Sequence, residues 1–140
     1  MIRKVLTAIA LVALAAPAAA EPPAAKAAPS TAPFVAVPLP AKAGEGKPKE
    51  HKLVADTVHQ KSVVITLRKG TVLPPHSSQH AAILQSLGGK GVVRMGDKTV
   101  ELSPTSMVLL EPGVTHEVVP DAGGDLIVLV HHLKTGHQAK

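Results

Sequence analysis

Between residues 52 and 133 the sequence is divided into short apolar runs, each ended by glycine, proline or a small polar residue. Runs of this kind, rich in valine, isoleucine and leucine, are typical of β-strands connected by tight turns. No stretch keeps a 3.6-residue amphipathic period long enough to predict a helix. The pattern therefore predicts an all-β domain of about eight short strands, folded as a sandwich or jelly-roll barrel.

Individual strands and turns follow from the same pattern. The Gly96-Asp97 pair predicts a two-residue hairpin, because such turns need positive φ angles. The wholly apolar run Met107–Leu110 predicts a strand that is buried on both faces or lies in a sandwich core. The Pro-Pro pair before His76 donates no ladder hydrogen bonds, so that approach belongs at a sheet edge or barrel mouth. The expected strands are Val63–Leu67, Ala81–Leu87, Val92–Met95, Lys98–Leu102, Met107–Leu110, His116–Val119 and Asp125–Leu133.

The N-terminus has the order of a secretory signal. Arg3 and Lys4 precede an apolar run, and small residues lead up to Ala20. The apolar run is shorter than the roughly 20 residues that a membrane-spanning helix needs. We therefore expect a signal peptide over residues 1–20, cleavage after Ala20, and a periplasmic or secreted protein with no stable membrane anchor after cleavage.

The mature chain is expected to begin with a linker. Residues 21–50 contain seven of the thirteen prolines together with many alanines, a composition that favours disorder. Residues 51–140 are then predicted to form the barrel and a short C-terminal tail. The chain has no cysteine, so this exported domain relies on apolar packing rather than disulfides.

Charge and composition exclude several functions. The chain carries a net charge of +5, yet residues 51–133 contain seven basic and seven acidic side chains, so the excess lies toward the termini. Phe34 is the only aromatic residue and lies in the linker, which leaves the barrel no ring for stacking on a base or sugar. We expect no nucleic-acid partner. The sequence also lacks the motifs of serine nucleophiles, phosphate loops and thiol-redox pairs.

A histidine cluster is the strongest chemical signal. His76, Ser78, His80 and Ala82 have the same parity, so in an extended segment their side chains point to one side. Neutral imidazole binds divalent transition metals such as iron, zinc, manganese, nickel and copper. His131 and His132 are adjacent, so one should face into the barrel and one out, and we interpret them as a strand-end and a surface histidine.

The spacing of this cluster matches a known family. Gly70, His76 and Gly89 fall in register with the first cupin motif, and Gly113 and His116 with the second. From His59 to Leu133 the chain resembles a small single-domain cupin of the RmlC-like superfamily. This resemblance implies a double-stranded β-helix barrel in which His76 and His116 are metal ligands.

Two ligand positions of the first motif depart from the family. Ser78 replaces the second histidine and Ala82 replaces the glutamate, which implies a partly degenerate metal site. His80 shares the parity of the ligand positions and is the candidate replacement; its other interpretation is a surface histidine.

Two functions follow from the resemblance. The first is an exported cupin that binds a divalent metal through His76 and His116, with His80 as the possible third ligand. If it is an enzyme, the relatives implied are metal-dependent oxygenases and isomerases. The second is a degenerate, non-catalytic barrel that binds a small-molecule ligand or has a structural role as a homodimer. The sequence leaves open whether the protein is an enzyme.

Overall fold

A computed structural model describes residues 36–134, so the expected signal peptide, residues 21–35 and the tail from 135 lie outside the described residues. Within the described range the protein has nine strands and no helix, which confirms the all-β prediction. No helix among these residues has the length and apolar character needed to cross a membrane. The strands are β1 Lys49–Asp56, β2 Gln60–Leu67, β3 Leu73–His76, β4 Ala81–Gly88, β5 Gly91–Met95, β6 Lys98–Leu102, β7 Met107–Leu110, β8 His116–Pro120 and β9 Leu126–Leu133.

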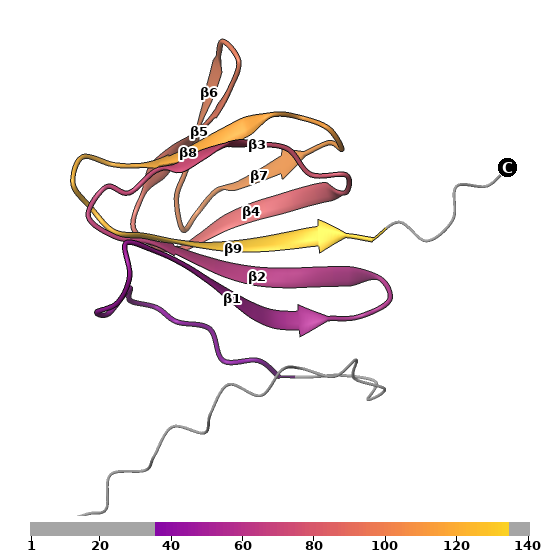
Figure 1. The fold of residues 1–140 in the computed structure, drawn as a ribbon, viewed down its shortest axis with the longest axis horizontal. Helices are drawn as coiled ribbons and strands as arrows, with labels where there is room; N and C mark the ends of the chain where they lie inside the picture. Colours follow the sequence, from indigo (N-terminus) through magenta and orange to yellow (C-terminus); the bar gives the residue numbers. More distant parts are fainter. Residues whose placement is uncertain (1–35, 135–140) are drawn as a thin grey trace, which may run out of the picture.

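The strands form two antiparallel sheets that face each other (Figure 1). One sheet has the order β1-β2-β9-β4-β7 and the other β3-β8-β5-β6. Apolar side chains from the inner faces of both sheets fill the space between them, since inward and outward residues alternate along each strand. The most deeply buried are Leu67, Leu84, Leu102, Leu126, Val93, Val118 and Val128.

Glycines set two of the turns. Gly96, with φ of 60°, lies in the predicted two-residue hairpin between β5 and β6. Gly89, with φ of 81°, follows β4 where the chain passes close to Asp125. A Cβ atom at Gly89 would lie 2.0 Å from the Asp125 carbonyl oxygen, so no other residue fits without moving the backbone.

Of the two interpretations of Met107–Leu110, burial on both faces is wrong, and a strand with one face in the sandwich core is what the structure has. These residues form β7, which is an edge strand of the five-stranded sheet. Val108 and Leu110 point into the core, whereas Met107 is 66% and Leu109 59% exposed. A fully apolar run therefore predicted a strand correctly. It did not predict that one face of the strand is exposed, since within residues 36–134 nothing covers the outer face.

The folded region begins earlier than the expected boundary at residue 51. Strand β1 starts at Lys49 and pairs with β2, so the end of the expected linker over 21–50 is part of the sheet. Ahead of β1, Ala43 packs on the outer face of the large sheet against Val64 and Ile127. The sequence suggested a linker here because its small and charged residues show no strand pattern.

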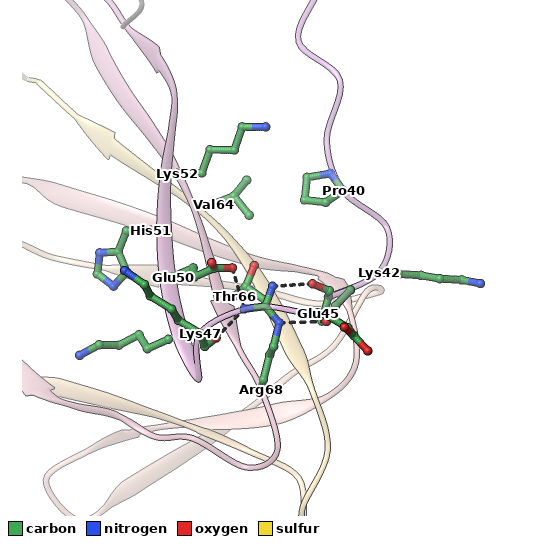
Figure 2. Close-up of a pocket in the computed structure, with 13 residues that line it drawn as sticks. Pro40, Lys42, Glu45, Lys47, Glu50, His51, Lys52, Val64, Thr66 and Arg68 are labelled. Carbon is green, nitrogen blue, oxygen red and sulfur yellow. Dashed lines mark hydrogen bonds and ion pairs between the residues drawn. The ribbon is translucent and has the colours of Figure 1, made fainter. Parts of the chain in front are cut away.

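Arg68, at the end of β2, holds the segment before β1 (Figure 2). Its guanidinium donates hydrogen bonds to the carbonyl oxygens of Ala43, Gly44 and Lys47 at 2.6, 3.0 and 2.5 Å. It also pairs with the Glu50 carboxylate at 2.6 Å. These bonds satisfy a side chain that is only 10% exposed, and they tie residues 43–47 to the barrel.

Candidate functional site at the barrel mouth

The two histidines of the motifs come together between β3 and β8. His76 and His116 are directly opposite each other in this antiparallel pair, so their side chains share one face. Their ring centroids are 4.3 Å apart and the rings are tilted by 54°. Strand β3 is an edge of the smaller sheet, as the Pro-Pro pair predicted. The pairing of these strands brings together residues that are distant in the sequence.

Backbone carbonyl groups fix the orientation of both rings. The Nδ1 atom of His76 lies 2.8 Å from the carbonyl oxygen of Pro74, and that of His116 lies 3.0 Å from the carbonyl oxygen of Val114. A carbonyl oxygen only accepts, so each Nδ1 carries the proton that it donates. In the neutral rings the lone pair is then on Nε2, which is the arrangement of metal-binding histidines in proteins.

His80 does not join this pair. Residues 77–80 form a loop between β3 and β4, so side-chain alternation does not continue through them. His80 is exposed, and its backbone N–H donates to Ser78 Oγ at 3.1 Å. Its side chain lines neither the cavity between the sheets nor the groove outside it. The parity argument for His80 requires a continuous strand, and the chain has none here.

His132, interpreted from the sequence as a strand-end or surface histidine, is the one that reaches the site. It lies on β9 opposite Ala82 of β4 and Lys61 of β2, and its Nδ1 is 3.3 Å from Ser78 Oγ. His131 points the other way, with Nδ1 2.7 Å from Ser62 Oγ. The expected alternation of these two histidines is confirmed. Only the register of β9 against β4 shows that the inward one faces Ala82, the position of the missing glutamate.

His76, His116 and His132 line one small cavity between the sheets. Its volume is about 40 Å³ and its other walls are apolar, including Leu73 and Val118. A space of this size holds little more than a water molecule or an ion. No three His, Cys, Asp or Glu side chains within residues 36–134 already stand in metal-ligand positions. The donor types nevertheless suit a transition metal, with two free Nε2 lone pairs and a third imidazole on the wall.

Outside the cavity, a groove of about 470 Å³ opens between β1–β2 and β3, and His76 and His132 lie on the wall of both spaces. A larger hollow of about 770 Å³ lies beneath the segment before β1 (Figure 2). Its central cation, Arg68, is already bound to backbone carbonyls and Glu50. We therefore place the site at the histidines and not in the larger hollow.

Burial favours neutral imidazoles here. Loss of solvent lowers the pKa of His116 and of His132, and the positive charges of His76 on His116 and of Lys61 on His132 lower it further. The backbone carbonyl of Val114 acts in the opposite direction on His116 and offsets part of the effect. At neutral pH both rings are therefore available as uncharged donors.

A pH dependence of stability follows. A histidine with a lowered folded-state pKa binds fewer protons folded than unfolded, so its contribution is complete above the unfolded pKa of about 6.5 and is lost as pH falls below it. In metal-free protein we expect the urea midpoint to fall between pH 7.5 and 5, and to fall less in His116→Gln. If the urea midpoint falls equally with pH in the two proteins, protonation of His116 does not contribute to the loss of stability.

Comparisons with known proteins agree with the fold. Residues 60–130 match the family described as AraC-like ligand binding domain. A cupin superfamily protein from Desulfitobacterium hafniense DCB-2 is 17% identical, with a TM-score of 0.60 over 69% of this chain and 89% of that one. An RmlC-like cupin from Desulfovibrio desulfuricans is 25% identical, with a TM-score of 0.55 over 61% and 82% of the two chains.

A third solved structure, KdgF from Halomonas sp., is 22% identical, with a TM-score of 0.55 over 61% of this chain and 79% of that one. No curated protein matches the sequence. The likeness to these structures supports the cupin jelly-roll fold, and the family match spans the barrel from β2 into β9. On this evidence the chain belongs to the family of AraC-like ligand-binding domains of the cupin superfamily.

Proposed function

We propose that the protein is an exported cupin that binds a divalent transition metal through Nε2 of His76 and His116. The observation that carries this proposal is the pair of rings at 4.3 Å, each with Nδ1 bonded to a backbone carbonyl. The carbonyl bonds select the tautomer that exposes Nε2 and hold both rings in place. The basis for export is the signal-like N-terminus, and N-terminal sequencing of protein isolated from cells tests cleavage after Ala20.

Two imidazoles alone hold such metals weakly, so the site needs a third donor. His132 is our candidate, because its ring lines the same cavity and lies across from Ala82. Ala82 leaves room on the sheet where a glutamate side chain would otherwise extend. His80 remains the alternative third donor, and the loop over residues 77–80 would then have to bring it inward.

The chain supplies the surroundings in which a bound metal acts. Leu73, Val118 and Val130 form an apolar wall next to the imidazoles. A divalent metal there would polarise an oxygen of a small ligand. The ligand enters from the groove, since the inner cavity of about 40 Å³ is too small to hold it.

The competing function is a barrel that binds a small molecule without metal. It is favoured by the absence, among residues 36–134, of three donors already in ligand positions, and by Ser78 and Ala82 at two motif positions. The two functions differ in one measurable property, which is the response of the folded state to metal.

Metal should stabilise the wild-type protein. Thermal melts of chelator-treated protein are recorded alone and with Zn²⁺, Ni²⁺, Mn²⁺, Cu²⁺ or Fe²⁺. Because the metal binds only the folded state, a hundredfold excess over the dissociation constant adds about 2.7 kcal/mol to the free energy of unfolding. If none of the five ions raises the midpoint, the barrel is non-metallic and the competing function stands.

A further inference from the structure

The groove outside the histidines lies between the edges of the two sheets. Strand β1 is an edge strand of the large sheet, and β3 is an edge strand of the small sheet. These two edges do not pair with each other, and residues of β1, β2 and β3 line the opening between them. With a volume of about 470 Å³, the opening falls in the range of small-molecule sites.

The groove is positively charged. Its lining includes Lys49 from β1 and Lys61 from β2, together with His51, His76 and His132, and no aspartate or glutamate. The two nearest acidic groups have other partners. Glu50 pairs with Arg68, and Asp56, which is opposite Lys61 on β1, pairs with Lys134.

His51 lies in the field of one of these lysines. Burial is the largest cause that lowers the pKa of His51, and the charge of Lys49 lowers it further. Positive charge in a partly enclosed groove attracts anions and raises their local concentration.

The floor of the groove is apolar. Leu73 of β3 lines it together with Val63 and Ile65 of β2, which lie between the positions of Lys61 and Lys49 in the β1–β2 pairing. Ser77 and Ser78 add hydroxyl groups near the histidines, while the lining contains no arginine. This combination suits a carbon chain that carries one or two carboxylates better than it suits inorganic phosphate, which has no apolar part to place on the floor.

We propose that the groove binds a small organic carboxylate, with an anionic group at Lys61, its carbon chain along the apolar floor and, in a dicarboxylate, the second anionic group toward Lys49. Lys61 is adjacent to His132 across the β2–β9 pair, so a ligand held by Lys61 reaches the histidine site. The inference names the ligand class for the site described above, but the groove itself does not depend on the metal.

Calorimetric titration of the purified full chain tests the proposal. The probes are butyrate, glutarate, the neutral analogue butyramide and inorganic phosphate, each with and without chelator. The carboxylates should bind, glutarate more tightly than butyrate. Butyramide should bind at least about tenfold more weakly, the scale of losing one hydrogen bond to a charged group. Phosphate should also bind more weakly, because it places no carbon chain on the apolar floor. Added salt should weaken carboxylate binding, because both lysines are exposed.

Matched variants locate the binding. Lys61→Met should lower carboxylate affinity about tenfold, since it keeps the aliphatic bulk and removes the charge. Lys98→Met is the control, because Lys98 is exposed on β6 and does not line the groove. Equal binding of butyramide, tighter binding of phosphate, or equal losses in the two variants would overturn the groove proposal.

The titrations in the presence of chelator distinguish carboxylate binding in the groove from metal binding. Carboxylate binding that persists in chelator but is weakened by Lys61→Met supports the groove even if no metal binds. Binding that requires metal and is unchanged in Lys61→Met overturns the groove proposal and leaves the metal proposal intact.

Discussion

Replacing His116 with alanine should abolish the stabilisation of the barrel by divalent metal. His116 is 6% exposed, faces His76 at 4.3 Å and presents Nε2 to the cavity. Loss of a partner that only orients a ligand costs about 10- to 100-fold in metal affinity, so loss of the ligand itself should cost at least about 100-fold. The measurement is the metal-induced shift of the thermal midpoint, because the variant also loses stability from the space left in the core.

Four further variants sharpen this experiment. His76→Ala should behave like His116→Ala. His131→Ala is the matched control, because His131 lies next to His132 but points to the other face of β9 and bonds Ser62. A normal metal shift in His116→Ala, or its loss in His131→Ala, contradicts the proposed ligands. A loss in His132→Ala with a normal shift in His80→Ala identifies the third donor, and the reverse result assigns it to the loop.

The parts of this site that were predictable from the sequence are local. The approach to His76 at a sheet edge follows from the Pro-Pro pair, which donates no ladder hydrogen bonds. The meeting of His76 and His116 follows from the register of both motifs, and the structure places the residues opposite each other. Likewise the Gly-Asp turn predicts the β5–β6 hairpin, because few residues accept the positive φ of 60° seen at Gly96.

The rest depends on pairings between distant strands. Alternation predicts that one of His131 and His132 faces inward, but only the β9–β4 register shows that His132 lies opposite Ala82. For His80 the same alternation misleads, because residues 77–80 leave the ladder. Similarly, the run Met107–Leu110 contains no information about its position at the edge of the sheet.

Replacing Arg68 with methionine should destabilise the barrel and release the segment ahead of β1. The guanidinium is the shared partner of three backbone carbonyls in residues 43–47, and the side chain is largely buried. Its removal leaves these acceptors without their donor, at an expected cost of about 3 kcal/mol in the free energy of unfolding. Urea denaturation measures the loss. Trypsin should also cut after Lys42 faster than in the wild type.

Arg94→Met is the matched control, because it removes the same side chain from a surface pair. Arg94 contacts Glu117 at 3.3 Å, but its side chain is 52% exposed, so the change should cost less than about 1 kcal/mol.

Arg68→Lys keeps the positive charge but removes the planar guanidinium. A single ammonium does not reach several carbonyls in the same way, so most of the loss in the free energy of unfolding should remain. Equal unfolding free energies for Arg68→Met and Arg94→Met would show that Arg68 does not hold residues 43–47. Faster tryptic cleavage with an unchanged unfolding free energy would show that this segment detaches without weakening the barrel, which would place the start of the folded core at β1.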